Sequence, residues 1–85
     1  MRSFVYVITD RVGIHARPAG MLVKEAQKYR SEILVSKGEK EADAKNLMQI
    51  MSLGAKCGDE ISVTVSGEDE EEACAAMESV LREKL

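Results

Sequence analysis

The sequence is poor in the residue types that build metal sites and disulfide frameworks. Its 85 residues include one histidine, two cysteines, one proline and no tryptophan. Cys57 and Cys74 lack the C-x-x-C spacing of zinc and redox motifs, and the sequence does not resemble a small secreted scaffold. We therefore expect two free thiols, no histidine–thiolate metal site and no cofactor.

Long apolar runs and an excess of basic residues are also missing. No segment approaches the ~18–20 apolar residues of a membrane span, and residues 1–4 lead into a strand-like segment rather than a signal peptide. The formal net charge is −3, whereas binding to a nucleic-acid backbone needs a basic face. These absences predict a cytoplasmic protein without membrane insertion or nucleic-acid binding, built as one domain over residues 1–85.

Residue patterns predict four strands separated by helices and turns. The strands are expected at residues 3–9, 32–36, about 40–44 and 61–66, where β-branched or alternating apolar residues occur. A glycine at position 38 suits a hairpin between the second and third of these strands. In the last strand, Ile61, Val63 and Val65 alternate with polar residues. That alternation predicts a sheet with one face on a core and one face open to water.

Helical spacing of apolar residues predicts two longer helices. The first is expected at about 16–29, and the second begins near Asp69 and runs toward the end of the sequence. Asp69 and Glu72 have the spacing of a capping box. The expected buried stripe of the second helix consists of Ala73, Met77, Val80 and Leu81.

A third, short helix is expected between Asn46 and Gly54, which are a good N-cap and a good C-terminal stop. Five of the seven residues from 47 to 53 are apolar, more than one buried stripe needs. Some of Leu47, Met48 and Met51 should therefore be exposed and could form a partner surface, to which flexible methionine is suited. The alternative is a helix buried on both sides.

The most informative segment is Gly13-Ile14-His15-Ala16-Arg17-Pro18-Ala19, which places the only histidine directly before a helix. The first N–H groups of a helix lack internal partners and carry the positive end of the helix dipole, so an anion is favoured there. Arg17 adds a permanent positive charge. His15 could itself become a phosphate carrier, because imidazole is a nucleophile. The alternative is a histidine that only caps the helix or is merely exposed.

These residues resemble the HPr phosphocarrier proteins of the bacterial phosphoenolpyruvate-dependent sugar phosphotransferase system. The resemblance covers essentially the whole chain and depends on two separated motifs, residues 13–19 and residues 46–54. The later Gly58-Asp59-Glu60-Ile61 and the turn at Ser66-Gly67 add to it. It implies an α+β open-faced β-sandwich with chain order βαββαβα, in which three helices cover one face of a four-stranded antiparallel sheet of order 1-4-2-3.

The same resemblance implies a function and a set of site residues. Nδ1 of His15 would accept a phosphoryl group from phospho-enzyme I and donate it to IIA components of sugar permeases, so the protein would be a carrier rather than an enzyme. Arg17 would accompany the phosphate, and the backbone N–H groups of Ala16 and Arg17 would bind it. The implied partner-binding residues are Ala16, Gly20, Met21, Lys24, Lys45, Leu47, Met48 and Met51. A monomer is expected, because the carrier must dock with two partners in turn.

The sequence departs from the family at one position. Asn46 stands where Gram-positive relatives carry a regulatory serine, and asparagine has no hydroxyl group to phosphorylate. No regulatory residue is therefore expected at that position. Two other functions remain open: an HPr-like module in a regulatory or nitrogen-linked relay, and a small acylphosphatase-like hydrolase that uses arginine and helix-end amides.

Overall fold

The computed structural model describes all 85 residues and contains four strands and three helices. The order is β1 (Arg2–Val7), α1 (Ala16–Ala26), β2 (Glu32–Lys37), β3 (Lys40–Asp43), α2 (Leu47–Ser52), β4 (Glu60–Ser66) and α3 (Glu70–Lys84). This sequence of elements confirms the predicted βαββαβα order. None of the helices is both long and apolar enough to cross a bilayer.

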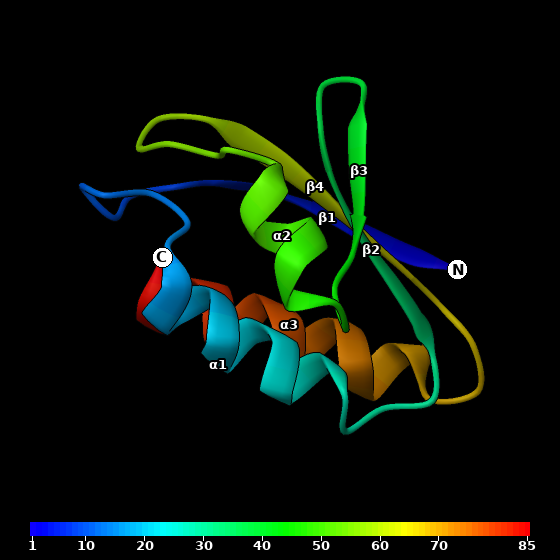
Figure 1. Ribbon diagram of the computed structural model, residues 1–85. Coiled ribbons are helices and arrows are strands. Elements are labelled where there is room, and N and C mark those ends of the chain that lie inside the picture. The colour runs from blue at the N-terminus through cyan, green and yellow to red at the C-terminus, as the bar shows by residue number, and fades with distance from the viewer.

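The strands form one antiparallel sheet in the order β1-β4-β2-β3. Val63 in β4 pairs with Phe4 of β1 on one side and with Val35 of β2 on the other, and Val35 in turn pairs with Ala42 of β3. All three helices lie on the same side of this sheet (Figure 1). The predicted open-faced α+β sandwich is therefore confirmed.

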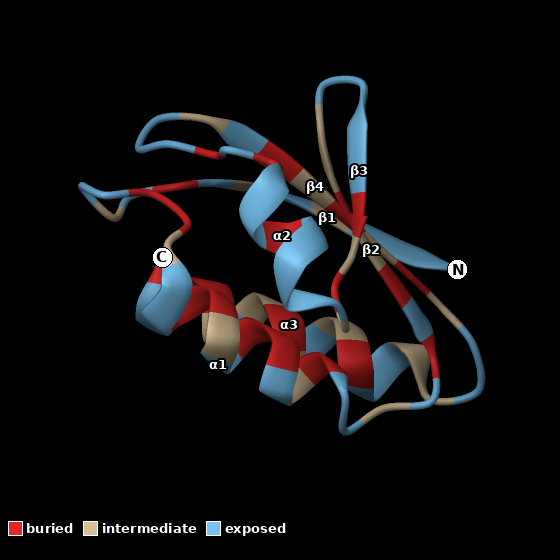
Figure 2. Ribbon diagram, in the orientation of Figure 1, coloured by how far each residue is buried: buried red, intermediate tan, exposed pale blue.

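The core lies between the sheet and the helices. Ile61, Val63 and Val65 of β4 are almost fully buried, and the polar residues between them are only half-buried, as the alternation predicted (Figure 2). In β1 the pattern is weaker, because Val5 and Val7 are exposed on the open face. The sheet therefore has one apolar face covered by helices and one face in contact with solvent.

The helices bury one stripe each. Pro18, Ala19, Leu22, Val23 and Ala26 are the buried residues of α1. In α3, Ala73, Met77 and Leu81 are buried as expected. Val80 was expected in the same stripe, but it is only partly buried against the core. Successive residues on a helix are about 100° apart. Val80 therefore lies at the edge of the buried stripe, which is centred on Met77 and Leu81.

Two elements end earlier than the sequence predicted. β1 stops at Val7. The Ile8 amide still donates to the opposite Asp59 carbonyl, but the Ile8 carbonyl accepts from Gly58, one residue out of register, and the Thr9 amide donates to Leu85. α1 stops at Ala26, and the amide of Tyr29 then bonds only three residues back, to Ala26. Such tightened bonds are common where an α-helix ends. Tyr29 still packs against the core from this turn.

Both cysteines are free thiols, Cys57 exposed and Cys74 half-buried. Burial in α3, with the nearby Glu78 carboxylate, raises the pKa of the Cys74 thiol. A raised pKa leaves little thiolate at neutral pH, so Cys74 is a packing residue rather than a reactive one.

The predicted capping box of α3 is wrong. Asp69 is the N-cap, but its carboxylate makes no capping bond to its own helix. It instead accepts hydrogen bonds from the amides of Arg30 and Ser31 at 2.9 Å each and from the Ser31 hydroxyl at 2.5 Å. The helix start is completed by Glu70, whose carboxylate accepts from the amide of Gly67 at 3.1 Å. Asp69 therefore joins α3 to the segment between α1 and β2.

The hydrogen bonds from the Ser31 hydroxyl and the Arg30 amide lower the pKa of Asp69 to about 2. An aspartate in an unfolded chain has a pKa of about 3.9. The folded state therefore binds this proton less readily, so the carboxylate stabilises the fold above about pH 4 and loses that effect as the pH falls toward 2.

We predict that Asp69→Asn lowers the free energy of unfolding at neutral pH and flattens its decline between about pH 4 and pH 2. Urea unfolding at a series of pH values measures both effects. Glu39→Gln is the matched control, because Glu39 is an exposed carboxylate without a hydrogen-bond or ion-pair partner. Equal pH dependence in Asp69→Asn and the unsubstituted protein would contradict this role for Asp69.

Candidate functional site

The loop between β1 and α1 is held in place by its own backbone. Gly13 donates from its amide to the Asp10 carbonyl at 3.0 Å, and the Val12 amide donates to Asp10 Oδ1 at 2.8 Å. The buried Ile14 donates to the carbonyl of Ala55 at 3.0 Å. These bonds fix the path of the chain immediately before His15, so the histidine backbone is anchored although it lies in a loop.

Gly13 is required by this path. Its φ angle is +80°, a left-handed conformation that only glycine adopts without strain. A Cβ atom at this position would overlap the Ala55 carbonyl oxygen and lie 2.7 Å from Cα of Lys56. The glycine at the start of the motif therefore allows the loop to pack against the segment that follows α2.

His15 is the N-cap residue of α1, with an extended backbone (φ −132°, ψ 179°). Its side chain makes no capping hydrogen bond and is 40% exposed. The imidazole therefore does not cap the helix. The ring is left free for chemistry with a molecule from solvent.

The first turn of α1 presents an anion-binding arrangement beside the imidazole. The amide of Ala19 donates to the His15 carbonyl at 2.9 Å, and Pro18 has no N–H group. The amides of Ala16 and Arg17 have no acceptor within the protein. These two groups, at the positive end of an 11-residue helix, are the free donors that the sequence predicted there.

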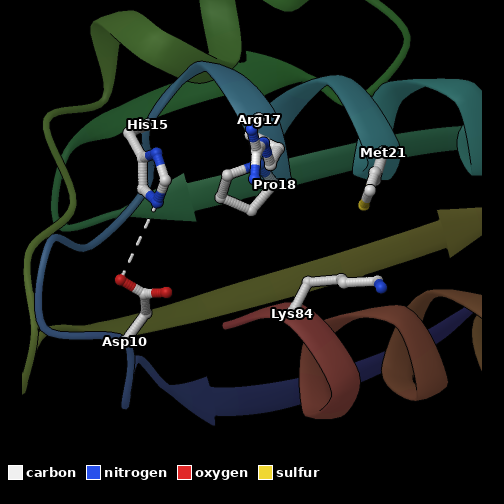
Figure 3. Close-up of a pocket in the computed structure, with 6 residues that line it drawn as sticks. All are labelled: Asp10, His15, Arg17, Pro18, Met21 and Lys84. Atoms are coloured by element: carbon white, nitrogen blue, oxygen red, sulfur yellow. Dashed lines mark ion pairs between the residues drawn. The ribbon is translucent and has the colours of Figure 1, made fainter.

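His15 lies at a shallow pocket of about 310 Å³ lined by six residues from three segments (Figure 3). They are Asp10, His15, Arg17, Pro18, Met21 and Lys84. Arg17 is exposed and forms no ion pair, so its charge is available to a ligand. The pocket combines a nucleophilic ring, two cationic side chains and helix-end amides, which together suit a phosphoryl group.

The sequence identified His15 and Arg17 but not Asp10 or Lys84 as members of this pocket. Asp10 lies in the loop between β1 and α1, and Lys84 is the last residue of α3. The end of α3 reaches the pocket only because its helix packs alongside α1 (Figures 1 and 3). No local sequence signal marks that contact, whereas the position of Asp10 five residues before His15 was an available hint.

α2 exposes a group of apolar side chains. Ile50 and Leu53 are buried beneath it, whereas Leu47, Met48 and Met51 are 39%, 77% and 40% exposed (Figure 2). We call these three residues the α2 patch. Asn46 caps the helix by accepting a hydrogen bond from the Gln49 amide at 3.1 Å. The prediction of partial exposure is confirmed, and the alternative of a helix buried on both sides is excluded.

The other predicted partner-binding residues lie on α1 or just before α2, and these two helices pack together. Ala16, Met21 and Lys24 are exposed, and Gly20 is half-buried. Lys45 is half-buried, and its ammonium group donates to the Tyr29 carbonyl at 2.7 Å. The structure therefore places the pocket beside His15 and the exposed apolar side chains on adjacent helices.

Comparison with known proteins identifies the family. Residues 2–83 match the family model described as the PTS HPr component phosphorylation site. The chain belongs to the HPr family of phosphocarrier proteins. The phosphocarrier protein HPr of Mycoplasma genitalium is 46% identical over 82 residues, which cover 95% of this chain and 93% of that protein.

Solved HPr structures have the same fold. A histidine-containing phosphocarrier protein of Mycoplasma superposes with a TM-score of 0.94 at 38% identity, covering 96% of this chain and 93% of that chain. HPr of Thermoanaerobacter tengcongensis gives 0.93 at 39% identity, covering 99% and 94%. A further structure of the T. tengcongensis protein is described as a dimer.

We predict that Gly13→Ala destabilises this HPr-family protein by about 1–3 kcal/mol, through left-handed strain and overlap with the segment after α2. Thermal or urea unfolding measures the loss. Gly38→Ala is the control, because Gly38 also has a positive φ of 60° but has nothing within 4 Å of the added atom. A loss no larger at Gly13 than at Gly38 would show that close packing of the loop is unimportant.

Proposed function

We propose that His15 is the phosphoryl acceptor in a phosphotransferase relay. In this proposal, Nδ1 of His15 receives a phosphoryl group from phospho-enzyme I and passes it to IIA components of sugar permeases. The protein is then a covalently phosphorylated intermediate and turns over no substrate alone. The observation that carries the proposal is the convergence of His15, Arg17 and the free amides of Ala16 and Arg17 at one helix start.

The orientation of the imidazole supports this choice of atom. Nε2 points toward Asp10, and the opposite ring nitrogen lies on the side of the α1 start (Figure 3). In the transfer, the Nδ1 lone pair forms the new bond to phosphorus while the bond to the donor breaks, with its electron pair going to the donor. In the second transfer, the acceptor forms a bond to phosphorus while the bond from Nδ1 breaks, and its electron pair returns to Nδ1.

The surroundings suit a phosphoryl group that must be passed on. Helix-end interactions contribute about 0.3–1 kcal/mol each, up to ~2 kcal/mol in favourable geometry, and Arg17 adds a charge-assisted contact. The pocket is shallow and the ring is 40% exposed. The phosphohistidine is therefore held moderately and remains accessible to a second protein.

We further propose that the α2 patch, with exposed residues of α1, is the docking surface for enzyme I and IIA components. Exposed apolar side chains that are not part of the core and lie near a reactive group are typical of partner surfaces. Methionine suits a surface that fits more than one partner. The expected contacts are Ala16, Gly20, Met21, Lys24, Lys45 and the α2 patch.

No serine switch is proposed at the start of α2. Asn46 gives the helix its cap through a side-chain carbonyl, and it offers no hydroxyl oxygen to a kinase. The protein is proposed to act in the cytoplasm as a monomer, since each phosphotransfer occupies the His15 face. Sedimentation at working concentration checks the monomer against the dimeric state described for the T. tengcongensis protein.

We predict that incubation with phosphoenolpyruvate and enzyme I adds a single phosphate to the protein, labile in acid and stable in base. Intact-mass measurement checks this result. His15→Ala is expected to take up none, because His15 is the only imidazole in the chain. An enzyme I-dependent adduct retained by His15→Ala would contradict the proposal.

In the same assay, Arg17→Ala is expected to fold normally and to slow transfer roughly ten- to a hundredfold, the effect of losing one hydrogen bond from a charged donor. Subsequent transfer to a sugar-specific IIA component distinguishes sugar uptake from a regulatory or nitrogen-linked relay. Steady hydrolysis of acyl phosphate by the protein alone would instead favour the acylphosphatase-like function.

We predict that Met48→Asp weakens binding to enzyme I at least tenfold with little change in thermal stability, because a charge must then be desolvated in an apolar contact. Titration calorimetry measures the affinity. Val5→Asp is the matched control, since Val5 is 58% exposed on the uncovered face of the sheet. If both variants bind enzyme I equally well, the docking surface lies elsewhere.

A further inference from the structure

Asp10 faces the ring nitrogen of His15 that the proposed transfer does not use. Oδ1 of Asp10 lies 3.8 Å from Nε2 of His15, and the two side chains are 29% and 40% exposed (Figure 3). The carboxylate is not free to turn away, because the same oxygen accepts the Val12 amide at 2.8 Å. The Asp10 amide is anchored in turn, donating to the main-chain oxygen of Leu85 at 2.8 Å.

This arrangement favours one protonation pattern of the ring. A neutral imidazole carries its proton on one nitrogen, and the partner of that nitrogen decides which one. A carboxylate beside Nε2 attracts a proton there and leaves the Nδ1 lone pair directed at the α1 start. The separation is longer than a hydrogen bond, but such contacts often tighten when the reacting group is in place.

We propose that Asp10 is a positioning residue for the phosphotransfer chemistry of His15, acting by holding the proton on Nε2. The proposal rests on the assignment of His15 as the phosphoryl acceptor. With the proton on Nε2, Nδ1 forms its bond to phosphorus without losing a proton, and the product is an imidazolium whose positive charge faces Asp10. When the N–P bond breaks, its electron pair returns to Nδ1, and a neutral imidazole leaves with the Nε2 proton still in place.

The charges around the ring oppose one another. Arg17 from α1 and Lys84 from α3 are the two cations that line the pocket, and Asp10 is the one acidic side chain that lines it. No ionisable side chain from the segment between α2 and β4 lines the pocket. In the proposal, Asp10 lies beside the ring proton on Nε2 and the phosphoryl group is on the opposite ring nitrogen, at the α1 start. Since a protonated ring is the better leaving group, Asp10 keeps the phosphoryl group transferable at higher pH.

The test uses potassium phosphoramidate, a small donor whose P–N bond breaks with release of ammonia, so it needs no enzyme I. The phosphorylated protein is followed by intact mass as it loses phosphate across a range of pH. In Asp10→Asn, the pH profile of phosphate loss is expected to move to lower pH by about half a unit, the size that a partly exposed ion pair supports. Nitrogen NMR of the unphosphorylated ring is expected to show a smaller Nε2–H fraction.

Three comparisons make the outcome specific. Asparagine retains an oxygen for the Val12 amide, and thermal unfolding verifies that the fold is kept. Asp10→Glu restores a carboxylate and should return the profile toward that of the unsubstituted protein. Glu39→Gln removes one negative charge from the exposed β2–β3 turn and should leave the profile in place.

Two results would overturn the inference. One is a profile and a tautomer fraction in Asp10→Asn that match those of Glu39→Gln. The other is slower phosphate loss at every pH without movement of the profile, which would show that Asp10 only repels the phosphate. Both readouts are independent of enzyme I, so they remain decisive if enzyme I fails to phosphorylate His15 and the proposed relay is wrong.

Discussion

Burial of one face of the sheet under three helices is the constraint on which the rest of this structure depends. The chain has only enough apolar residues for one layer of core between sheet and helices, and β4 supplies its centre through Ile61, Val63 and Val65. Since α1 and α3 must cover that face side by side, the start of one helix and the end of the other meet at the same edge of the molecule. The pocket beside His15 forms at this edge, and it is shallow because no second layer covers it.

The chemistry at this edge depends on a loop whose position is fixed and on side chains that remain free. Backbone hydrogen bonds at Asp10, Gly13 and Ile14 hold the loop, whereas the His15 ring and the Arg17 guanidinium are left without internal partners other than the distant Asp10 carboxylate. A carrier needs this combination. The anchored backbone keeps the imidazole beside the helix-end amides, and the ring remains accessible from solvent.

The site could be predicted from the sequence where its parts are contiguous. His15, Arg17 and the α1 start lie within a few residues, so helix polarity indicated them as a candidate site, and the family resemblance strengthened that hypothesis. The α2 patch was foreseen because residues 47–53 contain more apolar side chains than one stripe can bury. The predicted capping box was wrong because Asp69 has distant partners. Asp69 has capping-box spacing with Glu72, yet its carboxylate bonds to the amides of Arg30 and Ser31, 39 and 38 residues away.

The sequence by itself determined the order of elements, the inward face of β4 and the position of His15 directly before α1. Those features follow from periodicity and capping among neighbouring residues, which act before distant segments meet. Only the tertiary structure decided that Asp10 faces Nε2 and that Lys84 reaches the pocket from α3. A charged side chain on a surface has many local partners of similar energy, so its partner is chosen by the packing that brings two segments together.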